Sequence, residues 1–201
     1  MELFSSTSPS YLILQSLDRA NEYIDNGYAE KLDSFIGRVE KLKQTLVQNG
    51  FDIVGDEPLK LTVAPKRYGY TGEQLADMLL RNNVVCEFAD ADYCVMMLTP
   101  ETNGQEINRL EELLLDMEKK RPLTETPPMP EYAHRAMSVR EAMLSDSVEV
   151  AACEAAGKIL ASPSVSCPPA VPIVMCGEKI DNAAVNCFEY YRIKRVTVVK
   201  E

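Results

Sequence analysis

Apolar residues in the first quarter of the chain recur every three or four positions, which is the spacing of one buried face on an α-helix. This pattern predicts two lead-in helices within residues 9–48, separated at Asn26 and Gly27. Ser8 and Pro9 mark the start of the first helix, because a serine oxygen caps free N–H groups and proline tolerates the first helical position. We therefore expect both helices to pack their apolar faces on a core.

Short apolar runs alternate with amphipathic stretches across residues 51–120, which indicates a small α/β subdomain. Thr71 and Gln74 have the spacing of a capping box, so a helix is expected to begin there. The last apolar run is hydrophobic enough to be buried on both faces of a sheet, and another helix follows it. Strands are predicted for four runs: residues 51–55, 58–65, 84–88 and 92–100.

Four prolines fall within the nine residues from Pro122 to Pro130, a composition that supports neither a helix nor a central strand. Beyond them, short helices are predicted at 138–144 and 151–161, and strands around 171–175 and 191–199. The chain as a whole is predicted to be α/β (α+β). Its expected organisation is a major region at 1–120 (lead-in helices 9–48, subdomain 51–120), a Pro-rich linker at 121–137 and a small mixed domain at 138–201.

The charge of the chain excludes some classes of partner. Its 201 residues carry a formal net charge of −10, and no cluster of Lys or Arg compensates locally. A phosphate backbone or an anionic membrane surface would be repelled, so we expect neither nucleic acid nor a membrane as a partner. No apolar run approaches the ~20 residues that a spanning helix needs, and the N-terminus has no basic flank before an apolar stretch. A cytoplasmic location is expected.

Few residues offer metal or nucleophilic chemistry. The six cysteines include no CxxC pair, and His134 is the single histidine, so no metal site is predicted. Free thiols are expected, with Cys86 and Cys94 acting as small buried hydrophobes among apolar neighbours. Lys60 lies between two leucines and is a candidate for Schiff-base formation by its sequence context alone.

The hydroxyl-rich run SSTSPSYLILQSLDRA, residues 5–20, places Ser and Thr at the start of a helix, where an anion can bind. This run resembles the segment that follows the cofactor-bearing lysine in bacterial Orn/Lys/Arg decarboxylases, pyridoxal-phosphate enzymes of aspartate-aminotransferase fold type I. Later segments are similar to the small domain and C-terminal domain of the shorter, Gram-positive-type arginine and lysine decarboxylases. They are GFDIVGDEPLKLTV, GYTGEQLADMLL, CEFADADYCVMMLTPET, MSVREAML and CEAAGKILASPSVSCPPAVPIVMCGEKI.

The resemblance implies roles for three residues. Thr7 and Ser8 would reach the pyridoxal phosphate or substrate of a neighbouring subunit, and Glu87 would face the distal cation of a basic amino acid. The family's cofactor lysine lies upstream of the matched segment, so Lys60 is discounted and no catalytic residue is assigned to this chain. We expect the isolated chain neither to hold the cofactor covalently nor to decarboxylate a substrate.

Two hypotheses remain open. In the first, the chain is the C-terminal part of a decarboxylase of arginine, lysine or ornithine and works with a missing N-terminal half. In the second, it is a non-enzymatic interaction or regulatory module that binds a full-length homologue. Both imply an oligomer of at least two chains. Because the lead-in helices would normally pack on a large domain, Ile13 or Phe35 is expected to be exposed in this chain alone.

Overall fold

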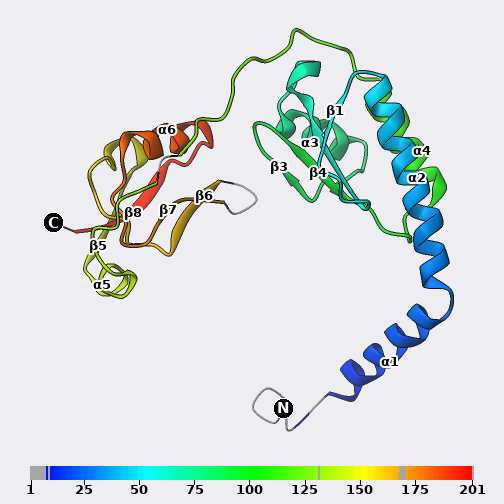
Figure 1. Cartoon of the computed structure of the whole chain (residues 1–201), viewed down its shortest axis with the longest axis horizontal. Coiled ribbons are helices and arrows are strands. Elements are labelled where there is room, and N and C mark those ends of the chain that lie inside the picture. The colour runs from blue at the N-terminus through cyan, green and yellow to red at the C-terminus, as the bar shows by residue number, and fades with distance from the viewer. Residues whose placement is uncertain (1–7, 9, 131, 168–170, 201) are drawn as a thin grey trace.

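The computed structural model describes residues 8, 10–130, 132–167 and 171–200, apart from the side chains of 166 and 167. These residues form two lead-in helices and two units with separate hydrophobic cores (Figure 1). We call residues 28–115 the first unit and residues 139–199 the second unit. None of the described helices is both long and apolar enough to cross a membrane.

Helix α1 (Tyr11–Asp25) meets α2 (Tyr28–Gln48) at Gly27, whose φ of 81° turns the chain between them. The N-cap of α1 is Ser10, not Ser8, and its side chain makes no capping hydrogen bond. The predicted cap was therefore wrong by two residues, because a Ser-Pro pair permits a helix start without fixing it. Pro9 lies outside the described residues.

The apolar faces of the two helices have different surroundings. Helix α1 has no buried residue, so the prediction that this helix packs on a core was wrong. Ile13 is 62% exposed, which confirms the predicted exposure of this residue. Phe35 is only 4% exposed, because α2 packs against β1 and α4 within the first unit. The expected exposure of Phe35 was therefore wrong. The burial in α2 follows its apolar repeat through Val39, Leu42 and Leu46.

The first unit contains a four-stranded antiparallel sheet of order β1-β2-β4-β3. Helices α2 and α4 pack against each other, and α3 packs against β3 and β4. Thr71 and Gln74 form the expected capping box at the start of α3. The elements after α2 are β1 (Asp52–Val54), β2 (Lys60–Ala64), the 3₁₀ helix η2 (Pro65–Tyr68), α3 (Gly72–Arg81), β3 (Phe88–Ala89), β4 (Cys94–Met97) and α4 (Gly104–Leu115).

Two strand predictions in this unit need correction. The run at 84–88 was predicted as a strand, but β3 includes only its last residue, Phe88, and continues to Ala89. Strand β4 is buried on one face only: Cys94 and Met96 are buried, whereas Met97 is 60% exposed. Side chains alternate across an antiparallel sheet, so an uninterrupted apolar run does not require a second covered face.

No helix or strand occurs in the described part of residues 119–137, which connects the two units along the top of Figure 1. The second unit has two two-stranded antiparallel sheets, β5-β8 and β6-β7. Its core includes Leu160, Ile180 and Phe188, each fully buried. The elements are α5 (Val139–Leu144), β5 (Ser147–Ala151), the 3₁₀ helix η3 (Ala152–Glu154), β6 (Ser164–Cys167), β7 (Val171–Met175), α6 (Asn182–Tyr190) and β8 (Arg195–Val199).

The helix predicted at 151–161 was wrong. Only η3 forms there, and Gly157 then adopts a φ of 85°, a turn conformation that an α-helix does not contain. The helix that packs against η3 and β7 is α6, which the sequence pattern did not indicate. Its N-cap Asp181 accepts a hydrogen bond from the N–H of Ala184 at 2.7 Å.

Candidate functional site

The residues implied as ligand-binding lie in two separate parts of the molecule. Thr7 lies outside the described residues, and Ser8 is exposed just before α1. Glu87 is exposed beside β3, where its N–H donates to the carbonyl of Val95 at 2.9 Å and fixes the backbone to β4. Figure 1 shows α1 and β3 well apart, so one copy of the chain does not join the two ends of the expected site.

The two other side chains considered for chemistry are on the surface or paired. Lys60 is half-buried and forms an ion pair with Glu57, which precedes it by three residues in the turn before β2. His134 is exposed, and its carbonyl accepts the N–H of Lys179 at 2.9 Å. The Lys60 ammonium is therefore engaged by Glu57, and His134 lies at an open cavity of about 500 Å³ that Lys179 and Asp181 also line. Among the residues that the structure describes, no group of three or more His, Cys, Asp or Glu is arranged to hold a metal ion.

The exposed face of α1 is the most apolar surface near the hydroxyl-rich run. Six large apolar side chains of α1 are each more than two fifths exposed. Four of them are consecutive in the first turn and so surround the helix, and exposed apolar side chains this closely spaced are typical of a segment that another protein surface covers. We call this set the α1 face; it consists of Tyr11, Leu12, Ile13, Leu14, Leu17 and Ile24.

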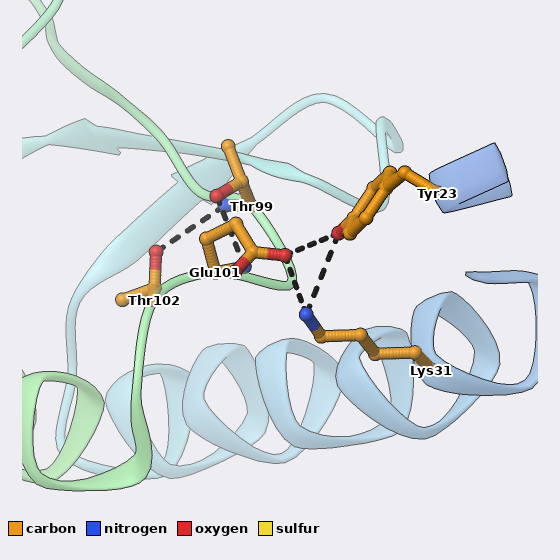
Figure 2. A network of polar contacts seen from close by, with 5 residues as sticks. All are labelled: Tyr23, Lys31, Thr99, Glu101 and Thr102. Atoms are coloured by element: carbon orange, nitrogen blue, oxygen red, sulfur yellow. Dashed lines mark hydrogen bonds and ion pairs between the residues drawn. The ribbon is translucent and has the colours of Figure 1, made fainter. Parts of the chain in front are cut away.

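A polar network holds α1 against the first unit. Figure 2 shows Tyr23 of α1 and Lys31 of α2 pointing at one carboxylate, that of Glu101 in the loop after β4. The Thr99 hydroxyl accepts the N–H of Glu101 at 3.2 Å and fixes that loop. The hydrogen bond from Lys31 lowers the pKa of Glu101. The hydrogen bond between Tyr23 and Glu101 raises the pKa of Tyr23. The network therefore sets the direction in which α1 leaves the fold.

A second network joins the two units and was not predicted. The Asp92 carboxylate lies 2.6 Å from the Lys66 ammonium, and the Tyr190 hydroxyl donates to the same oxygen at 2.8 Å. Lys66 also donates to the carbonyl of Glu125 at 2.7 Å. The side chains of Lys66 and Asp92 are only 15% and 8% exposed, so this ion pair is largely withdrawn from water. We call Lys66, Asp92 and Tyr190 the interunit cluster.

Each residue of the interunit cluster is positioned by the element or turn that carries it. Lys66 lies in η2 and Tyr190 is the last residue of α6. Asp92 is held by a turn in which one oxygen of Asp90 accepts the N–H groups of Asp92 and Tyr93, at 2.8 and 2.6 Å. Asp90 therefore acts as a turn residue, a common role for an aspartate side chain. Burial, and then the bond to Asp92, raises the pKa of Tyr190, and burial also raises the pKa of Asp90.

Beside the cluster lies an open cleft of about 450 Å³ between the units. Arg192 crosses its edge and pairs with Glu73 of α3 at 2.8 Å, with both side chains well exposed. Sequence analysis could not identify this interface, because Asp92 and Tyr190 are far apart along the chain and neither belongs to a local motif. A buried carboxylate beside a buried ammonium is visible only in the folded chain.

Comparison with known proteins gives these positions a context. Residues 118–198 match the model of the Orn/Lys/Arg decarboxylase C-terminal domain. The uncharacterised protein YaaO of Bacillus subtilis is 33% identical over 195 residues, covering 90% of this chain and 40% of the relative. The arginine decarboxylase of the same organism is 26% identical over 199 residues, covering 90% of this chain and 41% of the relative. The chain therefore spans about two fifths of the curated relatives it matches.

Solved structures share the fold. The constitutive lysine decarboxylase of Escherichia coli superposes with a TM-score of 0.71 at 12% identity, over 99% of this chain and 45% of the other. The lysine decarboxylase of Francisella novicida gives a TM-score of 0.71 at 13% identity, over 99% and 44%. These TM-scores establish a common fold. The family match over residues 118–198 and the similarity to arginine decarboxylases over 90% of the chain support its identification as a C-terminal portion of an Orn/Lys/Arg decarboxylase.

Proposed function

We propose that this chain supplies the C-terminal part of a pyridoxal-phosphate-dependent decarboxylase of arginine, lysine or ornithine, which yields an amine and CO₂. The observation that carries the proposal is the similarity to arginine decarboxylases, which covers 90% of this chain and therefore both units. The proposed division is the major region at 1–120, the linker at 121–137 and the C-terminal domain at 138–201.

The proposal assigns binding roles and no catalytic residue to this chain. Pyridoxal phosphate, when bound, supplies the electron sink for decarboxylation, and its lysine comes from the N-terminal part. The N-cap Ser10 makes no side-chain capping hydrogen bond in the described part of the chain, which is compatible with an anion at the start of α1. By the resemblance, Thr7 and Ser8 would lie against a neighbouring subunit's cofactor or substrate. Glu87 is exposed and can receive the distal cation of the substrate.

The α1 face supports the need for a partner. Helix α1 has no buried residue, so it contributes little packing energy to its own chain. Its apolar side chains would be buried only where a second protein surface packs against the helix. We assign that surface to the N-terminal decarboxylase part, or to the same part of a full-length homologue. A composite site at this junction makes the assembly at least dimeric, and each isolated chain is expected to be inactive.

The proposal is tested by mixing the chain with the separately produced N-terminal part of the Bacillus subtilis arginine decarboxylase. Association is measured by size-exclusion chromatography, and amine production is measured with arginine, lysine and ornithine. Leu17→Asp in the α1 face should abolish association, whereas Leu144→Asp should not, although Leu144 of α5 is even more exposed (75% against 57% for Leu17). Association with no amine from any substrate would support the alternative, a non-enzymatic regulatory module. Absence of both would contradict the proposed function.

A further inference from the structure

Two cysteines lie in contact beside the turn that positions Asp92. Cys94 is the first residue of β4 and is fully buried, whereas Cys86 precedes β3 and is half-buried against the same core. Their sulfur atoms are 3.3 Å apart, with the Cys94 thiol donating to Cys86. A disulfide bond is about 2.05 Å long, so the two sulfurs would have to move closer than their present contact for the bond to form.

The surroundings give the two thiols different reactivity. Cys86 is partly open to solvent, so a small oxidant can reach it, whereas Cys94 is shielded by the core. The hydrogen bond from Cys94 lowers the pKa of Cys86, and the same bond, with burial, raises the pKa of Cys94. The outer sulfur is therefore the better thiolate, and the inner thiol is in place to react with it after oxidation.

We propose that Cys86 and Cys94 form a reversible dithiol–disulfide switch that responds to peroxide. The Cys86 thiolate attacks one oxygen of hydrogen peroxide and the O–O bond breaks, which gives a sulfenic acid and hydroxide. The Cys94 thiol then attacks that sulfur, a disulfide forms, and water leaves with the protons. In sum, two thiols and one peroxide give one disulfide and two waters. A low-molecular-weight thiol reverses the reaction by disulfide exchange.

The switch would act on residues already described. The residues between the two cysteines include Glu87, Asp90 and Asp92, so a disulfide would close this loop at its base. Closing a short loop restricts the unfolded chain and slows local opening. Oxidation is therefore expected to hold the Asp90 turn, and with it the interunit cluster, more firmly. This inference does not depend on the decarboxylase function.

Peptide mass spectrometry of the full-length chain tests the switch directly. Trypsin does not cut between the two cysteines, because no Lys or Arg occurs from residue 82 to 108. After treatment with hydrogen peroxide, peptide 82–109 should lose the mass of two hydrogen atoms and regain it with dithiothreitol. Cleavage after Glu87 should leave the two fragments joined. Hydrogen exchange of amides 87–93 should slow on oxidation.

Variants and a reference cysteine make the result decisive. Cys86→Ser should abolish the mass loss, and Cys153→Ser, which removes an exposed thiol, should leave it unchanged. Cys86 should react at least about tenfold faster than Cys153, because the hydrogen bond from Cys94 favours its thiolate, and the Cys94 thiol, already in contact, then converts the sulfenic acid to the disulfide. Oxidation of Cys153 while peptide 82–109 keeps its mass would overturn the proposal. So would conversion of Cys86 to sulfinic acid without a disulfide.

Discussion

Removing the Asp92 carboxylate tests whether the interunit cluster joins the two units. In Asp92→Ala, the ammonium of Lys66, whose side chain is 15% exposed in the present structure, loses its counter-ion, and the Tyr190 hydroxyl loses its acceptor. Removing one partner of a buried pair costs about 3–5 kcal/mol. The Asp92 carboxylate already has one buried oxygen without a hydrogen-bond partner among the described residues, and Lys66 keeps its bond to the Glu125 carbonyl. We therefore expect a loss of about 2–4 kcal/mol.

Arg192→Gln is the matched control, because it removes an exposed ion pair that joins the second unit to the first. Arg192 and Glu73 are 68% and 41% exposed, and exposed pairs contribute about 0–1 kcal/mol. The free energy of unfolding is measured by urea titration with circular dichroism, since the chain has no tryptophan for fluorescence. Equal losses for Asp92→Ala and Arg192→Gln would refute the reasoning that the Asp92 carboxylate, held by Lys66 and Tyr190 away from water, contributes more than an exposed ion pair.

Three further predictions concern single side chains. Gly72→Ala should cost more than about 3 kcal/mol in thermal unfolding, because its Cβ would lie 1.9 Å from the carbonyl oxygen of Tyr93; an unchanged midpoint would contradict this packing. Phe188→Ala should cost about 3–5 kcal/mol, since this ring is fully buried in the second core, and a smaller loss by urea titration would mean that the core collapses around it. Burial raises the pKa of Tyr190 above its ordinary 10.0, so the hydroxyl contributes fully to folding stability below pH 10 and loses that contribution as the pH rises above it. The stability advantage of the unchanged protein over Tyr190→Phe, measured by urea titration, should therefore shrink between about pH 9 and pH 11. A difference that stays constant with pH would exclude this linkage.

Features set by neighbouring residues could be predicted from the sequence. The capping box of Thr71 and Gln74 formed because both partners lie within one helical turn, and the apolar repeat of α2 identified the residues that it buries. The helix predicted at 151–161 failed where the fold required a turn at Gly157. There the wider packing overrode a local helical pattern.

The candidate site was only partly accessible to sequence reasoning. Glu87 could be named from a resemblance, and the structure adds that it is exposed beside β3. The contact of Lys66 with Asp92 and Tyr190 depends on how two units dock, which no local spacing encodes. Likewise, Cys86 and Cys94 looked like ordinary small hydrophobes until their sulfurs were found in contact.

The central claim, that this chain completes a basic amino-acid decarboxylase, is tested most directly by CO₂ release. Carboxyl-labelled arginine, lysine and ornithine would each be supplied, with pyridoxal phosphate, to the chain alone, to an N-terminal decarboxylase part alone and to their mixture. We predict labelled CO₂ from at least one substrate in the mixture only, reduced in Glu87→Gln. Release of labelled CO₂ by the chain alone, or none from a mixture shown to associate, would contradict the claim.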